Sequence, residues 1–155
     1  MGYSVDTWET DFHISADKVQ AALAAVNADP ALERPCWDRA HYWPNHGSDA
    51  TVAEHDCQRP KPFESLTEAV EELTGFHDCE EDDGFRLGHH LDKWMSASED
   101  LLHVLGRYAD EGSFVRLMGE DNELFGYRVV DGKLCDENAT VTWEVAPIFV
   151  RGETG

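Results

Sequence analysis

Five side chains that could bind a metal ion lie within residues 36–57 of the chain. Cysteine thiolates and histidine imidazoles are ligands that Zn²⁺ prefers, and a tetrahedral site can stabilise a segment that lacks its own hydrophobic core. The four expected ligands are Cys36, His41, His55 and Cys57, with His46 beside them. Their spacing is not that of a zinc knuckle, and the chain has eight histidines, so two alternatives stay open. Either zinc cross-links the segment, or its aromatic residues anchor it and the histidines remain solvated.

The segment that carries these residues, 29–63, is predicted to be a long irregular loop. It has neither helical nor strand periodicity, and it contains five prolines together with Trp37, Tyr42 and Trp43. Compact domains rarely contain such a long loop without a role. Trp37, Trp43 and Trp94 lie outside the clearly periodic segments. They are candidates for contacts with a partner, although a role as anchors that pack the loop against the fold is the simpler expectation.

Motifs typical of enzymes are absent from the chain, which has no G-x-S-x-G, P-loop, G-x-G-x-x-G or H-E-x-x-H pattern. Histidine–carboxylate pairs such as His55-Asp56 carry little information, because almost every histidine of so acidic a chain has a carboxylate near it. A cysteine nucleophile with a remote histidine stays open, and no spacing supports a second metal site. We therefore expect a non-enzymatic protein that needs no cofactor unless zinc is bound.

The carboxylates are concentrated between Lys61 and Arg86, where the chain has no lysine or arginine. Like charges at i, i+4 on a helix cost a few tenths of a kcal/mol per pair, so stability alone would favour interleaved lysines. Such a surface either keeps the protein soluble or binds a basic partner. The expected partner-binding residues are Glu64, Glu68, Glu71, Glu72, Glu80, Glu81, Asp82 and Asp83, and Asp78 is a ninth carboxylate in the same window.

Composition excludes several classes of protein. The 155 residues contain 32 acidic against 12 basic side chains, giving a net charge of −20, which disfavours direct binding to nucleic acid or to an anionic membrane. An apolar share of 41%, with five Trp, seven Phe and four Tyr, is too high for a disordered chain. The length predicts one domain over 1–155. Without an apolar run of membrane-spanning length or a secretion signal, we expect a cytoplasmic protein with reduced thiols.

The N-terminal half is predicted to form one strand and two helices. Residues 3–14 alternate with period 2, which places Trp8 and Phe12 on one face of a strand. Ser15 is a good N-cap for a helix over 15–28, and Ser65-Leu66-Thr67-Glu68 is a capping box for a second helix. The expected buried residues of the two helices are Val19, Ala22, Leu23, Val26, Leu66, Ala69, Val70 and Leu73.

The C-terminal half is predicted to contain a hairpin, one helix and three more strands. Residues 76–79 and 85–87 flank the acidic turn 80–84 as the arms of a β-hairpin, and a helix follows over about 98–109 with a capping box at Ser96 and Glu99. The three final strands lie at 113–118, 124–130 and 133–145, and Asp131-Gly132 is expected to form a two-residue turn between the last two.

This order of elements predicts an α+β fold. A strand, helices, a hairpin, a helix and a strand form the split β-α-β arrangement, so we expect a ferredoxin-like antiparallel sheet with helices on one face. The additional strands at the C-terminus are predicted to extend the sheet as a β-meander.

The stretch from Gly75 to Glu144 contains the acidic hairpin turn, then Tyr108-Ala109-Asp110-Glu111-Gly112-Ser113-Phe114-Val115, and then the Met118–Lys133 stretch with Gly119-Glu120-Asp121-Asn122. In these features it resembles a group of small uncharacterised acidic α+β proteins of bacteria and bacteriophages. Asn122 stands where the group has a second turn glycine, and residues 29–63 look like an addition. The resemblance implies an α+β meander and a possible phage origin, and it implies no activity.

Three functions follow as alternatives. The first is an acidic interaction protein, consistent with a phage gene, that mimics nucleic-acid charge and occludes a basic site on a host protein, either a nucleic-acid-binding site or one on a defence factor. The second is a small zinc-binding protein or enzyme built on residues 36–57. The third is an immunity-type protein that neutralises a basic toxin, which sequence cannot separate from the first because both use the same electrostatics.

Overall fold

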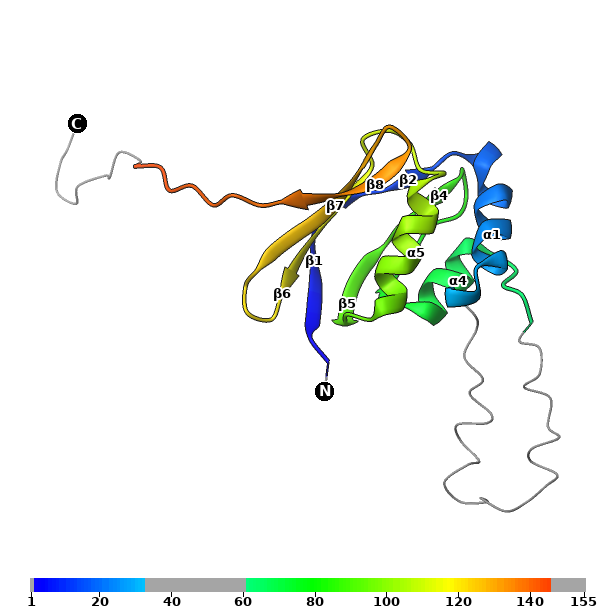
Figure 1. Cartoon of the computed structure of the whole chain (residues 1–155), viewed down its shortest axis with the longest axis horizontal. Helices are drawn as coiled ribbons and strands as arrows, with labels where there is room; N and C mark the ends of the chain where they lie inside the picture. Colours follow the sequence, from blue (N-terminus) through cyan, green and yellow to red (C-terminus); the bar gives the residue numbers. More distant parts are fainter. Residues whose placement is uncertain (1, 33–60, 146–155) are drawn as a thin grey trace, which may run out of the picture.

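The computed structural model describes residues 2–32 and 61–145 (Figure 1). The strands in this part of the chain are β1 (Ser4–Asp11), β2 (His13–Ile14), β3 (Phe76–His77), β4 (Phe85–Arg86), β5 (His89–Lys93), β6 (Phe114–Gly119), β7 (Leu124–Val130) and β8 (Lys133–Asn138). The α-helices are α1 (Val19–Ala28), α4 (Leu66–Leu73) and α5 (Ser96–Gly106). Six strands form an antiparallel sheet in the order β3-β5-β1-β6-β7-β8, and β2 pairs with β4 separately. The predicted α+β class is confirmed.

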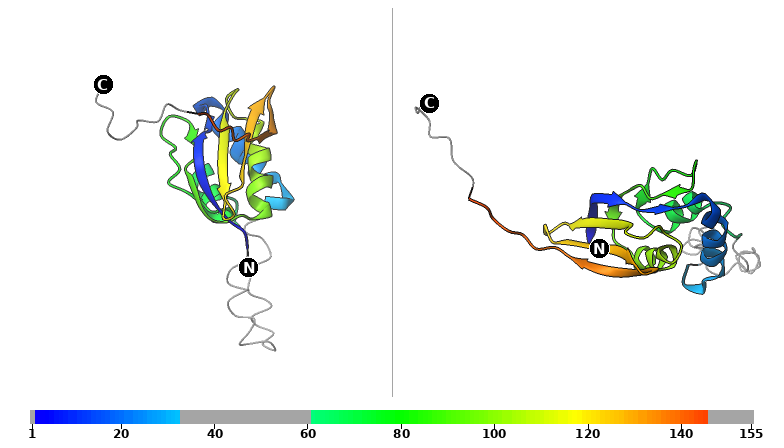
Figure 2. Two further views of the ribbon diagram at one scale, coloured as in Figure 1. Left: turned by 90° about the vertical axis from the view of Figure 1, so that its left-hand side faces the viewer. Right: turned by 90° about the horizontal axis from the view of Figure 1, so that it is seen from above.

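The hydrophobic core lies between the sheet and the helices, which pack on one face of the sheet (Figure 2). All eight residues predicted to form the apolar faces of the first two helices are buried. The sheet contributes side chains such as Val5, Leu117 and Val129, each at most 1% exposed. The other face of the sheet, here called the helix-free face, carries charged side chains such as Arg116 and Glu137.

A β-bulge divides the first predicted strand. The register of β1 against β6 shifts between Thr7 and Glu9, so Trp8 is an extra residue in the ladder. An extra residue reverses the alternation of side chains, because successive strand residues point to opposite faces. Val5 therefore faces the core before the bulge, Phe12 faces it after the bulge, and Trp8 is 61% exposed. The prediction that Trp8 shares the buried face was wrong for this reason.

The predicted hairpin around the acidic turn exists only as a single bridge. Glu80 and Arg86 exchange two backbone hydrogen bonds of 3.0 and 2.8 Å, but β3 pairs with β5 and β4 pairs with β2. Strand β5 was not predicted, because His89-His90-Leu91-Asp92-Lys93 shows no apolar alternation and only His90 is buried. The two short arms thus belong to different sheets, and the turn lies between them.

The last helix and last strand begin and end differently from the prediction. Met95 is the N-cap of α5 and Ser96 is its first residue, with no side-chain cap, so the predicted Ser96–Glu99 capping box was wrong. The expected two-residue turn is confirmed, since Asp131 and Gly132 have φ of 52° and 72°. Strand β8 ends at Asn138 instead of Val145. The alternating side chains of residues 139–145 suit a strand, but these residues have no neighbouring strand to pair with in the described structure.

The two ends of the predicted long loop pack against α1. Residues 30–32 form a 3-10 turn, the element η2 (Pro30–Leu32), where an irregular chain was expected, and Leu32 is buried. At the other end, the Asn27 side chain donates to the Phe63 carbonyl at 3.0 Å and accepts from the Phe63 N–H at 2.8 Å. This pair of bonds positions the chain just before α4 and its acidic residues.

Candidate acidic interaction surface

Nine carboxylates within residues 64–83, on or next to α4 and the acidic turn, form what we call the acidic surface. All nine are exposed except Glu68, which is half-buried. The residues are Glu64, Glu68, Glu71, Glu72, Asp78, Glu80, Glu81, Asp82 and Asp83. The apolar side of α4 is buried in the core, so the glutamates of α4 lie on the remaining sides of the helix.

Glu81 joins the turn to the N-terminus of α4. Its Oε1 accepts hydrogen bonds from the backbone N–H of Leu66 at 3.0 Å and of Thr67 at 3.2 Å. Helix N-termini have unpaired N–H groups and a positive dipole end, so a carboxylate is favourable there. The turn 80–83 therefore lies against the start of α4, and the two sources of negative charge form one surface.

The predicted capping box at the same helix end is confirmed in one half. Ser65 is the N-cap, and its Oγ accepts from the Glu68 N–H at 3.0 Å. The Glu68 carboxylate accepts from the Glu64 N–H at 3.0 Å, where the capping box would have it accept from Ser65. Glu68 and Glu81 are thus both expected partner contacts and structural elements of the helix end.

Cys79 lies near three carboxylates of the acidic surface. It is half-buried, and its Sγ accepts from the Gly88 N–H at 3.3 Å. Burial is the main reason that the pKa of the Cys79 thiol is raised to about 11; the hydrogen bond from the Gly88 N–H opposes the rise, and the charges of Glu71, Asp78 and Glu81 add to it. Carboxylates from α4 (Glu71), from the acidic turn (Glu81) and from the residue before Cys79 (Asp78) therefore act on the same thiol. The thiol is protonated at neutral pH, which is unfavourable for a cysteine nucleophile.

His13 holds the acidic turn at Asp83. Its Nδ1 lies 2.7 Å from Asp110 Oδ2 and its Nε2 lies 3.2 Å from the Asp83 carbonyl oxygen. Both ring nitrogens face acceptor oxygens, which only the imidazolium satisfies fully. The Asp110 hydrogen bond, followed by that of the Asp83 carbonyl, accordingly raises the pKa of His13. The imidazole holds the turn to β2 and to the loop after α5.

Ser15 completes this cluster without forming a catalytic triad. Its Oγ donates to Asp110 Oδ1 at 2.7 Å, and it makes no helix-capping bond, so the predicted N-cap role of its side chain was wrong. The bond from His13, followed by that from Ser15, lowers the pKa of Asp110. In a triad the serine is bonded to the imidazole, whereas here it is bonded to the carboxylate. The cluster therefore positions the turn and offers no activated nucleophile.

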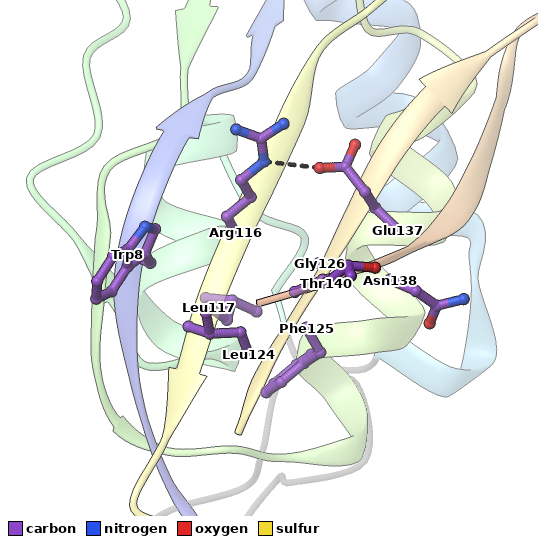
Figure 3. Close-up of a pocket in the computed structure, with 10 residues that line it drawn as sticks. Trp8, Arg116, Leu117, Leu124, Phe125, Gly126, Glu137, Asn138 and Thr140 are labelled. Carbon is purple, nitrogen blue, oxygen red and sulfur yellow. Dashed lines mark hydrogen bonds and ion pairs between the residues drawn. The ribbon is translucent and has the colours of Figure 1, made fainter. Parts of the chain in front are cut away.

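A shallow hollow opens on the helix-free face (Figure 3). Trp8 and Leu124 supply apolar lining, and Arg116 crosses the hollow. The Arg116 guanidinium donates to Glu137 at 2.6 Å and to Glu9 at 2.8 Å, and these bonds, that of Glu137 first, raise the pKa of Arg116. Its cation is thus neutralised within the sheet, and the hollow is a poor site for an anionic ligand.

Glu137 is held from two sides. Partial burial alone would raise its pKa, but the hydrogen bonds from Arg116 and Arg128 lower it below the ordinary value. Both guanidinium groups also lie over the Phe114 ring, at 4.6 and 4.8 Å from its centroid. The carboxylate and the two arginines form a structural network that cross-links β6, β7 and β8.

An aromatic cluster on the core side contains Trp94 and His90. Trp94 stacks on Tyr127 with centroids 6.3 Å apart and meets Phe125 edge-on at 5.8 Å, so it is an anchor rather than an exposed contact. His90 is 1% exposed, donates from Nδ1 to the Val5 carbonyl at 2.6 Å, and packs against Phe76. Burial lowers the pKa of His90, and the ring is a core residue.

The predicted zinc ligands Cys36, His41, His46, His55 and Cys57 lie outside the described residues, as do Trp37 and Trp43. Within 2–32 and 61–145, no group of three or more His, Cys, Asp or Glu side chains is placed to hold a metal ion. The acidic surface, dense as it is, therefore does not converge on a common point.

Comparison with protein-family models, with curated proteins and with solved structures finds no match to the chain. In the part that the structure describes, the helices fall short of the length and apolar character needed to span a bilayer.

Proposed function

We propose that the protein is a non-enzymatic interaction protein whose acidic surface occupies a basic site on a host protein by charge mimicry. The observation that carries this proposal is the clamping of the acidic turn to α4 by Glu81. Because of that clamp, nine carboxylates from a stretch without lysine or arginine are presented together. An array of negative charges on a rigid scaffold resembles the phosphates of nucleic acid, so the expected target is a nucleic-acid-binding protein or a defence factor.

The electrostatics favour binding over mere solubility. Solubility requires net charge, which acidic residues spread over the whole surface supply equally well. Concentrating one sign produces a directed field that steers a basic partner and speeds association. Two sets of hydrogen bonds also hold the acidic turn in place, one between Glu81 and the start of α4 and one between His13 and the Asp83 carbonyl. A purely solubilising turn has no need to be fixed.

The topology supports the finer fold assignment that we propose, a ferredoxin-like sheet. In the order β3-β5-β1-β6, strand β5 lies between β1 and β3, and β1 lies between β5 and β6. Helices connect β1 to β3 and β5 to β6, which is the split β-α-β arrangement twice over. Strands β6, β7 and β8 then pair consecutively as a meander. This arrangement agrees with the resemblance to bacterial and phage proteins, and we propose a phage origin on that ground.

Affinity capture from a bacterial lysate tests the proposed function. The variant Glu71→Lys/Glu80→Lys/Asp82→Lys reverses three charges of the acidic surface while sparing Glu68 and Glu81, which stabilise the N-terminus of α4. Its matched control, Asp6→Lys/Asp100→Lys/Asp136→Lys, changes the net charge equally at exposed positions elsewhere.

The wild-type protein and the control are expected to capture the same basic partner at low salt and to lose it as salt rises, because salt screens exposed charges. The acidic-surface variant is expected to capture none of it. Equal capture by all three proteins would refute the proposal.

A further inference from the structure

The segment that follows β8 exposes an unusual amount of apolar surface. In residues 139–145 Trp143 is 93% exposed, Val145 is 100% exposed and Val141 is 66% exposed. The segment leads away from the rest of the structure (Figure 1). Valine, threonine and tryptophan alternate here as they do in a half-buried strand. Exposed apolar residues in such a pattern mark a surface that another chain covers.

The strand that leads into this segment has a free edge. β8 is the last strand in the order of the six-stranded sheet that the described residues form. An edge strand presents unpaired backbone N–H and C=O groups, which is a template for a further strand. A free edge and a strand-forming segment thus lie in line within 133–145.

We propose that residues 133–145 of two copies of this chain pair as antiparallel strands, so that each copy's 139–145 segment adds to the β8 edge of the other. A two-fold axis at Ala139 makes the pairing self-complementary, as a symmetric dimer requires. In this register Trp143 lies opposite Cys135 of the second copy, Val141 lies opposite Glu137, and Val145 lies opposite Lys133.

The faces of the strands agree with this register. Leu134 is buried against the helices, whereas Cys135 is exposed and Glu137 meets the arginines of the helix-free face. Because side chains alternate, Val141, Trp143 and Val145 continue on the same face as Cys135 and Glu137. The small Cys135 side chain leaves room for the indole of the other copy. Both copies can therefore cover their exposed apolar residues on the helix-free face.

The expected affinity is modest. Each indole can bury roughly 150–250 Å², so two indoles and four valines bring the interface to the order of 1,000 Å², the lower end for specific association. Two chains of net charge −20 repel each other. Within β8, however, the charge of Glu137 is neutralised by Arg116 and Arg128. Added salt should therefore strengthen the dimer, the opposite of its effect on a basic partner.

Sedimentation velocity of the full chain, under reducing conditions at about 100 μM, tests the proposal in the range where a weak specific interface is occupied. We expect a reversible dimer whose population rises when salt is increased to about 0.5 M. The variant Val141→Pro/Thr142→Pro removes two adjacent N–H groups, which point to opposite edges of a strand, so it breaks the pairing in any register. It should be monomeric. Trp143→Ser should also weaken the dimer at least tenfold, whereas Leu91→Ser, which removes a 65% exposed residue on β5, should not.

Two results would overturn the proposal. One is a wild-type chain that sediments as a monomer at both salt concentrations, which would leave residues 139–145 for a different partner. The other is a dimer that persists in the double proline variant, which would place the interface elsewhere. Neither result bears on the acidic surface, since the proline variant keeps all nine of its carboxylates and should still capture the basic partner.

Discussion

Replacing Glu81 by alanine should destabilise the protein through the N-terminus of α4. The first four N–H groups of this helix each have an acceptor in the structure. Leu66 and Thr67 donate to the Glu81 carboxylate, while Glu68 and Ala69 donate to Ser65 at 3.0 and 3.2 Å. Glu81→Ala removes the acceptor of two of the four. The helix has only eight residues, so half of its N-terminal hydrogen bonding depends on one side chain from the turn.

The size of the effect follows from these bonds. A single capping interaction is worth about 0.5–2 kcal/mol, and a carboxylate near a helix N-terminus adds about 0.3–1 kcal/mol. Water can replace part of both because Glu81 is exposed, so we expect a loss of about 1–2 kcal/mol in the free energy of unfolding. Glu81→Gln keeps an acceptor oxygen and loses only the charge, so its loss should stay below about 1 kcal/mol.

Urea denaturation followed by circular dichroism measures these differences. Asp82→Ala is the matched control, because it removes a neighbouring exposed carboxylate that makes no contact with the helix end, and its effect should stay within about 0.5 kcal/mol. If Glu81→Ala and Asp82→Ala have equal stabilities, the Glu81 clamp does not hold the turn to α4, and the turn and the helix do not form one acidic surface.

Two further predictions concern the supports of the acidic turn. The pKa of His13 is raised in the folded protein, so protonated His13 stabilises the fold. This stabilisation is fully present below the unfolded pKa of about 6.5 and is lost as pH rises through the folded pKa. Between pH 5 and pH 8, urea titrations should therefore show a smaller fall in the free energy of unfolding for His13→Gln than for wild type. The difference should be less than about 1 kcal/mol, because the His13–Asp110 pair is partly exposed. The lowered pKa of His90 has the opposite effect on the pH dependence, but His90 is present in both proteins, so its effect cancels. Gly88→Ala places a Cβ 1.8 Å from the His77 carbonyl oxygen, so unfolding experiments should show a loss of about 3 kcal/mol, and a loss below about 1 kcal/mol would show that the backbone yields easily.

Local patterns predicted the elements that depend on local chemistry. The apolar faces of α1 and α4 and the turn at Asp131-Gly132 are as expected, because helical spacing and a positive φ are properties of a few neighbouring residues. The failures depend on distant partners. Strand β5 exists because β1 and β3 lie on either side of it, and its one buried residue is a histidine whose donor is taken up by Val5.

The bulge at Trp8 shows the same limit. Alternation along residues 3–14 is real, but one extra residue in the register against β6 reverses which side chains face the core. Similarly, residues 139–145 have the alternation of a strand, but they lie outside the sheet because no described strand lies beside them to pair with.

For the candidate site, the sequence located the charges but not what holds them. The acidic window between Lys61 and Arg86 is visible in the sequence. That Glu81 reaches the start of α4, and that His13 reaches the Asp83 carbonyl across 70 residues, depends on the tertiary fold. As a result, charge reversal at Glu81 would alter both stability and binding, which is why the test variants avoid it.

The most direct test of the central claim is competition with nucleic acid. The captured partner would be bound to a fluorescent DNA duplex, and the anisotropy followed as this protein is added. We expect the wild-type protein and the Asp6→Lys/Asp100→Lys/Asp136→Lys control to release the DNA. The Glu71→Lys/Glu80→Lys/Asp82→Lys variant should need at least about tenfold more protein, a difference of about 1.4 kcal/mol. Equal release by the acidic-surface variant, or a partner that binds this protein and DNA together, would contradict charge mimicry.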